Sequence, residues 1–449
     1  MLKRKITQGI ENWYKDGTVA LLIDGARQVG KTTTIEQFLI DNNIEYTEFN
    51  LFNDSLVREA FNKSTNCNQL LLRLTSLTKK EIKEGSVIFI DEIQEAKDAL
   101  TIIKFLVKEA KFKFIFSGSL LGIKMKDIVS VPVGYLKTIS MYPMDFEEFL
   151  WANNVSLKTI DYLKDCFYNL IEVDEIVHKQ MMSIFNTYLT VGGMPKAVVN
   201  FITSNDLNKV NNALEDVDSG YKTDIVKYKE ENKLLIQDIY DLIPSELNAQ
   251  NKRFILKNLN ENARFYKYET SFTWLKNSGI GLFVHNVDNP IYPLLASKER
   301  TLFKLFLCDV GLLTYKLYNG KQIIVLNGDS TLNFGAIYED VVAQELNSHG
   351  FELYYNSNKK RGEIDFLIEK DNKVIPLEVK SGKDYKRHSA LSSLLNDDAF
   401  NCEKGYVLCN GNIEKDNKTI YIPIYMIMFF IKTRKKDSQI VKLDISKLI

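Results

Sequence analysis

A loop framed by two glycines near the start of the chain limits the possible folds more than any other stretch. An apolar run at residues 19–23 leads into this loop, and a helix is expected from Lys31 to about residue 40. The glycines let the backbone turn with its N–H groups inward, where they can surround a phosphate, and the helix adds its positive N-terminal end. A chance glycine turn before a helix is the plainer alternative. We predict a nucleotide-phosphate loop formed by Gly25, Ala26, Arg27, Gln28, Val29, Gly30, Lys31, Thr32 and Thr33, with Lys31 on the terminal phosphates and Thr32 on Mg²⁺.

Composition indicates a multidomain globular protein of a reducing compartment. The 449 residues, of which 45% are hydrophobic, are enough for several domains. The 58 Lys and Arg balance the 58 Asp and Glu, so any nucleic-acid surface must be local. The five cysteines form no C-x-x-C pair, which is typical of cytosolic proteins. We expect a cytoplasmic protein without a membrane partner, because no signal peptide is evident and the apolar residues 420–431 are too short to span a bilayer. That segment is expected to be a buried strand or helix.

A second apolar strand, at residues 87–90, ends in two adjacent acids, Asp91 and Glu92. Strands and helices alternate around it, which predicts a parallel, doubly wound sheet. Such sheets place ligands at the carboxyl ends of their strands. We therefore expect Asp91 to hold Mg²⁺ beside Thr32, and Glu92 to act as the general base for an attacking water. The plainer alternative is a helix N-cap pair that follows a strand.

A further strand, at residues 111–116, ends in Ser117, Gly118 and Ser119. We expect this strand to lie between the first strand and the Asp91 strand, with Ser117 or Ser119 facing the γ-phosphate; an ordinary turn is the alternative. A GTPase would need Asn-Lys-x-Asp, which the sequence from Asn62 to Thr65 lacks. A small-molecule kinase would not need Glu directly after the strand Asp. ATP hydrolysis is therefore favoured over both.

Several motifs occur together in one order: the phosphate loop, Asp91-Glu-Ile-Gln94, Ser117-Gly-Ser119, Pro143-Met-Asp-Phe-Glu-Glu-Phe149, Gly192-Gly-Met-Pro195, Asp224-Ile225 and Asp309-Val-Gly311. Over nearly the whole chain they resemble a widespread family of prokaryotic AAA+-like ATPases with an uncharacterised C-terminal domain. The resemblance implies a P-loop NTPase core of the ASCE type that binds ATP and Mg²⁺, and it is compatible with a homo-oligomer. The family usually shows Gly-Arg before the Pro143 segment, whereas this chain has Gly134-Tyr135 and lacks that charge.

We expect four parts: a P-loop ATPase core at 1–152, a helical lid-like region at 153–232, a winged-helix-like domain at 233–325 and a nuclease-like domain at 326–449. Three helices and a hairpin at 234–317 give the outline of a winged helix, with residues 267–276 in the position of the recognition helix. The basic residues there are few, namely Arg264, Lys267 and Lys276. DNA contact, partner docking and a purely internal role remain open for this helix.

The C-terminal part brings acids and a lysine together. We expect a helix at 334–346, a strand at 351–355, and a hairpin of residues 361–368 and 374–382 that turns at Asp371-Asn372. Glu378 and Lys380 point to one face of their strand, and Asp365 lies across the hairpin. Asp365 and Glu378 are predicted to bind Mg²⁺, and Lys380 to orient or deprotonate the water that attacks a phosphodiester.

This pattern resembles the PD-(D/E)XK restriction-endonuclease-like superfamily, and Glu339 on the preceding helix matches its frequent helix acid. The resemblance implies an α+β fold in which Asp365, Glu378 and Lys380 are catalytic. The first element here is Glu-Ile-Asp rather than Pro-Asp. A half-exposed hairpin with merely solvated side chains is the alternative.

Together these features predict an α/β ATPase that hydrolyses ATP with Glu92 and is coupled to a nuclease-like half acting on DNA. Two alternatives stay open: a regulatory scaffold whose nuclease-like fold binds DNA or protein without cleavage, and a nuclease that the ATPase part gates. The sequence does not rank Arg58, Arg73 and Arg264 as candidates for the arginine that completes a neighbouring site.

Overall fold

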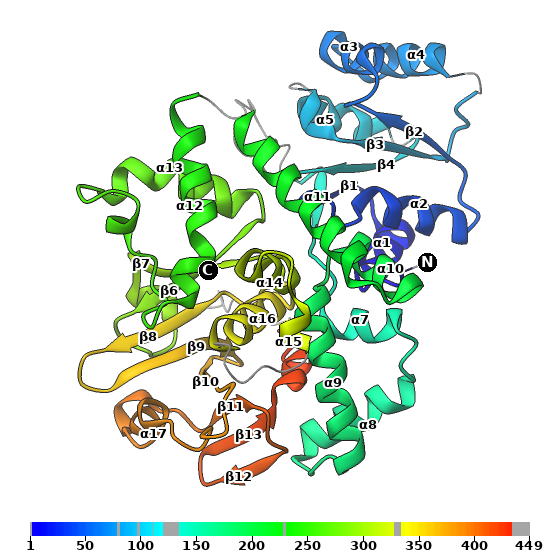
Figure 1. The fold of residues 1–449 in the computed structure, drawn as a ribbon. Helices are drawn as coiled ribbons and strands as arrows, with labels where there is room; N and C mark the ends of the chain where they lie inside the picture. The colour runs from blue at the N-terminus through cyan, green and yellow to red at the C-terminus, as the bar shows by residue number, and fades with distance from the viewer. Residues whose placement is uncertain are drawn as a thin grey trace, which may run out of the picture.

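A computed structural model describes residues 2–78, 81–96, 99–109, 111–119, 134–227, 230–326 and 334–432. An N-terminal α/β unit, a helical region and a C-terminal unit around a second sheet follow one another along the chain (Figure 1). Within these ranges, no helix combines the length and the apolar character needed to cross a membrane.

The N-terminal unit is built on a five-stranded sheet in which all neighbouring strands are parallel. The strand order is β2-β3-β4-β1-β5, so β4 lies between β1 and the Asp91 strand, as predicted. This confirms the α/β P-loop fold expected from the sequence. The strands are β1 (Ala20–Gly25), β2 (Tyr46–Asn50), β3 (Val87–Asp91), β4 (Lys113–Gly118) and β5 (Leu136–Met141).

Helices cover both faces of this sheet (Figure 1). Successive residues of a strand point to opposite faces, so Leu22 packs with one buried cluster and Leu21 with the other. One face carries α3 (Ser55–Lys63), α4 (Cys67–Leu77) and α5 (Ala99–Glu109), and the other carries α1 (Ile6–Asp16) and α2 (Lys31–Asp41). The cluster beneath α1 and α2 continues into the rest of the chain, so the ATPase sheet shares its core with the C-terminal half.

The region after β5 is helical, as predicted. Asp145 caps the first of its helices, accepting the N–H of Glu148 at 2.9 Å. The helices are α7 (Phe146–Ala152), α8 (Leu157–Asn169), α9 (Glu175–Val191), α10 (Pro195–Ser204) and the long α11 (Leu207–Val226), which runs between the two sheets in Figure 1.

Gly192 and Gly193 lie where the helical region contacts both the segment before α7 and the C-terminal unit, and we call this contact the Gly192 joint. The Gly193 N–H donates to Asp309 Oδ2 at 2.6 Å, and the Gly193 carbonyl accepts from the Met144 N–H at 2.7 Å. The joint therefore ties the segment before α7, the turn after α9 and the start of α14 (Val310–Tyr318) to one point.

The C-terminal unit contains an eight-stranded mixed sheet of order β12-β13-β11-β10-β9-β8-β6-β7. Its strands are β6 (Gly281–Val287), β7 (Lys298–Leu307), β8 (Tyr354–Asn358), β9 (Gly362–Lys370), β10 (Lys373–Val379), β11 (Gly405–Cys409), β12 (Glu414–Asp416) and β13 (Thr419–Pro423). Its helices are α12 (Glu230–Asn248), α13 (Phe265–Asn277), α14, α15 (Ile323–Leu326), α16 (Phe334–Ser348) and α17 (Ser389–Leu395).

Two details of this unit differ from the outline expected from the sequence. The helices and hairpin of 234–317 are present, but β6 pairs with β8, with His285 opposite Tyr354, so the hairpin extends the C-terminal sheet rather than standing free. The strand expected at 351–355 begins only at Tyr354. The apolar segment 420–431 is buried up to Phe430 and forms β13 and the 3₁₀ helix Ile424–Phe429, as expected. The four-part domain division stays a prediction.

The Gly192 joint yields a stability prediction. Gly192 has φ +76°, and a Cβ there would lie 2.3 Å from Asp309 Oδ1 and 2.8 Å from the Gly311 Cα. Gly350 has φ +86°, but its Cβ would meet nothing within 4 Å. Gly350→Ala should therefore cost about 1 kcal/mol of unfolding free energy for its backbone alone, and Gly192→Ala should cost about 1–3 kcal/mol more. Urea unfolding of both variants measures this difference, and equal losses would refute the crowding at the joint.

Candidate functional site

The phosphate loop has the backbone that its glycines predict. Gly25 and Gly30 adopt φ of +152° and +95°, and α2 begins directly after Gly30. The Lys31 ammonium lies inside the loop and donates to the carbonyls of Gly25 at 3.1 Å and Ala26 at 2.8 Å. Burial lowers the pKa of Lys31. A desolvated cation enclosed by a turn and a helix N-terminus is a strong point of attachment for phosphate.

Asp91 lies beside this loop at the carboxyl end of β3, where three side chains hold its carboxylate. Its Oδ2 accepts from Thr32 Oγ1 at 3.1 Å and from Asn50 Nδ2 at 3.0 Å. Its Oδ1 accepts from the Ser117 hydroxyl of β4. The structure thus brings together Thr32 and Asp91, the two residues predicted to bind Mg²⁺, and it adds Asn50. The end of β2 could have drawn attention to Asn50, because neighbouring parallel strands end at one edge.

Glu92 follows Asp91 in a left-handed conformation, with φ of +57°. Its carboxylate accepts from the Gln94 amide, and Gln94 Oε1 in turn accepts the N–H of Ser119 at 3.2 Å. Gln94 therefore fixes Glu92 relative to the end of β4. Ser117 contacts Asp91, whereas Ser119 lines the cavity in front of the loop.

A cavity of about 240 Å³ in front of the loop has walls from both halves of the chain. Arg27, Lys31, Glu92, Gln94 and Ser119 line it from the ATPase unit; Tyr221, Asp224 and Lys227 line it from α11 and the residue after it; Trp274 and Ser278 line it from α13 and the residue after it.

Two contacts join these walls. Arg27 Nη1 lies 2.7 Å from Asp224 Oδ1, which gives the Asp224 landmark a structural role. A Cβ on Gly279 would lie 3.3 Å from the Ala26 nitrogen, so the turn after α13 runs directly against the loop backbone.

Of the predicted loop residues only Arg27 and Lys31 line this cavity, and Val29 and Thr33 have other surroundings. Val29 is fully buried and its carbonyl accepts from Arg4 Nη1 at 2.9 Å. Arg4, which sequence reasoning missed, also pairs with Glu148 at 3.0 Å and so braces the back of the loop. Thr33 is exposed and borders a separate hollow near α1. Its expected contact with nucleotide stays a prediction.

The C-terminal acids also come together, around a lysine that sequence reasoning missed. Val379 donates its N–H to Asp365 Oδ2 at 2.8 Å, and Lys380 Nζ lies 2.7 Å from Glu378 Oε1. Lys304 of β7 has a fully buried side chain whose Nζ lies 3.0 Å from Glu339, 2.7 Å from Glu363 and 3.7 Å from Asp365. A second lysine, Lys252, pairs with the other oxygen of Glu339.

We call these residues the lysine–acid cluster, and their charges compensate one another. Its members are Lys252, Lys304, Lys380, Glu339, Glu363, Asp365 and Glu378. Burial alone would lower the pKa of Lys304, but Glu339, Asp365 and Glu363 outweigh burial and raise it above its ordinary value. Burial, Glu339 and Glu378 raise the pKa of Asp365 well above its usual range. An ammonium thus lies among the carboxylates, and within the described ranges Asp365 and Glu378 belong to no group of three close metal-ligand atoms. The position of Lys304 within the apolar run Phe303–Leu307 could have indicated a lysine buried beside acids, since buried lysines are rare unless paired.

Three segments match known protein families. Residues 18–150 match an AAA domain, residues 182–322 match a domain of unknown function (DUF8612), and residues 334–427 match another domain of unknown function (DUF4143). The match to the AAA domain model agrees with the P-loop fold of the N-terminal unit. The matches assign no activity to the C-terminal unit, so winged-helix, DNA-binding and nuclease roles remain proposals.

Relatives and solved structures extend this comparison. An uncharacterized protein of Methanocaldococcus jannaschii is 24% identical over 79% of this chain and 73% of its own length. An uncharacterized protein of Haemophilus influenzae is 22% identical over 82% of this chain and 83% of its own length. A Walker-type ATPase of Pyrococcus abyssi is 16% identical over 70% of this chain and 96% of its own, with a TM-score of 0.43. The structure of PCH-2 of C. elegans is 12% identical over 48% of this chain and 68% of its own, with a TM-score of 0.28.

The lysine–acid cluster yields a second stability prediction. Lys304→Met should lower the unfolding free energy by about 3–5 kcal/mol at neutral pH, because it removes the ammonium that Glu339, Glu363 and Asp365 share and leaves Glu339 with Lys252. Without Lys304 the folded-state pKa of Glu339 should rise above the unfolded value. The loss should therefore shrink as the pH falls toward about 5 and that carboxyl takes up a proton. Urea midpoints at both pH values measure this.

Lys360→Met is the matched control, because Lys360 is an exposed lysine near the end of β8, a strand of the same sheet. It should change stability by less than about 0.5 kcal/mol. A loss for Lys304→Met no larger than that of the control would contradict the central place given to Lys304.

Proposed function

We propose that the chain binds ATP with Mg²⁺ at the phosphate loop and hydrolyses it. The supporting observation is the convergence of Lys31, the Thr32–Asp91 pair and Glu92 at one edge of a parallel sheet. The match of residues 18–150 to an AAA domain supports the same reading. The residues present fit a triphosphate, because a buried ammonium and a helix N-terminus face the cavity.

Each residue has a distinct proposed task. The loop backbone and Lys31 hold the phosphates, and Thr32 and Asp91 would hold Mg²⁺, whose charge stabilises the phosphate oxygens in the transition state. Asn50 and Ser117 keep the Asp91 carboxylate oriented. Glu92 accepts the proton of the attacking water.

Nucleotide in this cavity would touch the C-terminal half as well as the ATPase unit. The cavity wall includes α11 and the end of α13, and α13 packs beside the sheet that carries the lysine–acid cluster. The Arg27–Asp224 pair has side chains 42% and 32% exposed, so it contributes at most about 1 kcal/mol to keeping the walls together. Nucleotide binding can therefore break or rearrange the Arg27–Asp224 pair at small cost.

A second candidate function concerns the C-terminal unit. Its lysine–acid cluster favours a module that binds DNA or protein without cleaving, because the two carboxylates that a catalytic metal would need already face ammonium groups, Asp365 that of Lys304 and Glu378 that of Lys380. The proposal also includes DNA as the partner, a homo-oligomeric state and a cytoplasmic location. These three parts rest on the sequence analysis.

The proposed hydrolysis makes a specific prediction for Glu92. Glu92→Gln should retain ATP binding but lower turnover by about 10²–10⁴-fold, because the amide cannot accept the proton of water. Phosphate release and equilibrium binding of ATP measure the two effects. Glu95→Gln is the matched control, since Glu95 lines the same cavity, and it should keep most of the activity. Wild-type turnover in Glu92→Gln would reject Glu92 as the base.

The C-terminal proposal predicts a negative result with an internal control. With Mg²⁺ or Mn²⁺, the wild-type chain should nick supercoiled DNA no faster than Asp365→Ala or Lys380→Ala, because ammonium groups already pair with Asp365 and Glu378. Agarose-gel conversion of supercoiled to open-circular DNA measures this. Nicking by the wild type that both substitutions abolish would instead establish the nuclease reading.

A further inference from the structure

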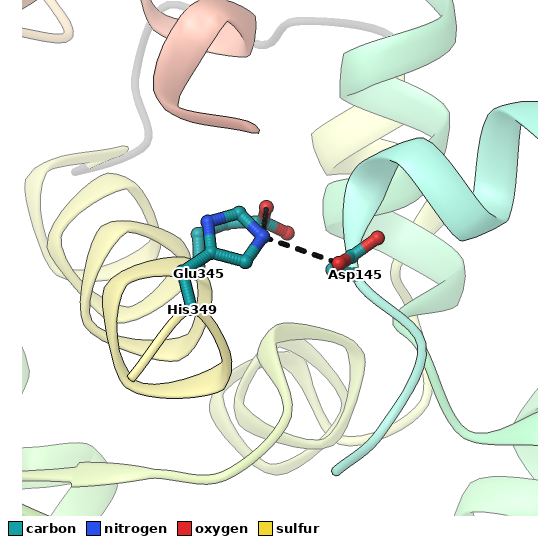
Figure 2. A group of neighbouring side chains, drawn as sticks. All are labelled: Asp145, Glu345 and His349. Atoms are coloured by element: carbon teal, nitrogen blue, oxygen red, sulfur yellow. Dashed lines mark hydrogen bonds and ion pairs between the residues drawn. The ribbon is translucent and has the colours of Figure 1, made fainter. Parts of the chain in front are cut away.

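Three potential metal ligands meet where the start of α7 faces α16, away from the nucleotide cavity. His349 Nε2 lies 3.2 Å from Asp145 Oδ2 and 3.9 Å from Glu345 Oε2. One ligand atom from each residue lies within 4.8 Å of the others. Figure 2 shows the imidazole edge directed at both carboxylates. Glu345 and His349 are four residues apart and so share one face of α16.

Each of these side chains is held by its other polar atom. His349 Nδ1 lies 2.9 Å from the Phe430 carbonyl and Nε2 lies 3.2 Å from Asp145 Oδ2, so the carbonyl fixes the ring and a bound metal ion would take the place of the Nε2 proton. Asp145 Oδ1 accepts the Glu148 N–H at 2.9 Å, and Glu345 Oε1 accepts the Phe146 N–H at 2.7 Å. Such outer contacts orient the ligands of metal sites in proteins.

The Glu345 carboxylate provides an independent observation. Its side chain is fully buried, and its Oε2 makes no hydrogen bond within the described structure. This oxygen is the one turned toward His349. Burial raises the pKa of Glu345 to about 7. A buried carboxylate oxygen without a donor is costly, and a bound cation would remove that cost.

Lys5 competes with a bound ion for this position. Its ammonium lies 2.6 Å from Asp145 Oδ2 and 2.7 Å from Glu147. The Lys5 side chain is 31% exposed and pairs with Glu147 as well, so a bound ion would have to displace it from Asp145 only. Its departure would free Asp145 Oδ2 and open the way for an ion and a water.

We propose that Asp145, Glu345 and His349 bind one divalent transition-metal ion, with Zn²⁺ the best fit. Separations of 3.2 and 3.9 Å between ligand atoms suit a tetrahedral ion with bonds of about 2.0–2.2 Å. The imidazole and the small ligand number disfavour Mg²⁺ and Ca²⁺, which prefer more oxygen ligands. Water completes the fourth position. Since Asp145 caps α7 and the other ligands lie on α16, the ion fastens the ATPase unit to the C-terminal unit.

The test uses the full-length chain, stripped with a chelator and free of nucleotide. Co²⁺ titrated into the wild type should produce the visible absorption bands of tetrahedral cobalt at one equivalent, and Zn²⁺ should displace them. His349→Ala and Glu345→Gln should abolish the bands or weaken binding at least about 100-fold. His178→Ala is the matched control, because His178 contacts Tyr425 and Asn410 instead, and it should bind like the wild type.

A second measurement covers variants that fold poorly. Lys5→Met keeps all three ligands and removes the competing ammonium, so it should bind Zn²⁺ at least as tightly as the wild type, and Zn²⁺ should raise the melting temperature of both. The absence of cobalt bands and of any Zn²⁺ shift in the wild type and in Lys5→Met would overturn the proposal. So would cobalt bands that persist unchanged in His349→Ala.

Discussion

Parallel pairing of β1, β4 and β3 is the constraint on which the site depends. Because the three strands run in one direction, their carboxyl ends meet at one edge, where β1 delivers the phosphate loop, β3 delivers Asp91 and Glu92, and β4 delivers Ser117. A buried lysine, a carboxylate held by three donors and a carboxylate held by an amide then lie next to one cavity. The chemistry follows from this register rather than from any single residue.

The C-terminal half completes that cavity. The turn at Gly279 lies against Ala26, and Asp224 of α11 reaches Arg27, so the loop is enclosed by the same chain that carries it. The joint at Gly192, Gly193 and Asp309 makes a second attachment between the halves. Burial raises the pKa of Asp309 to about 6, which shows how closely this joint is packed. A nucleotide-dependent change would therefore act on α11 and α13 first.

The sequence was sufficient to predict the five-stranded parallel sheet, because a buried strand must be apolar and the polar side chains of the site follow directly after such a strand. That logic located Lys31, Asp91, Glu92 and Ser117 and the position of β4. It could not locate Arg4, and it gave no role to Gln94 of the Asp91 motif, since the contacts of both depend on three-dimensional packing.

In the C-terminal half, local pattern predicted the hairpin of β9 and β10 but not its partners. The pairing of β6 with β8 joins segments about seventy residues apart, and no periodicity reports such a contact. The same long-range pairing delivers Lys304 to Glu339, Glu363 and Asp365, and the metal-binding role expected of Asp365 and Glu378 stays a prediction. The lysine within an apolar strand was the visible sign of this arrangement.

The most direct measurement is hydrogen exchange of the backbone amides with and without ATP and Mg²⁺. The account predicts that nucleotide slows exchange in residues 25–32 and also changes it at the end of α13, around residues 274–280, because both line one cavity. Exchange that changes at neither segment, or at the phosphate loop alone, would contradict a nucleotide site shared by the two halves of the chain.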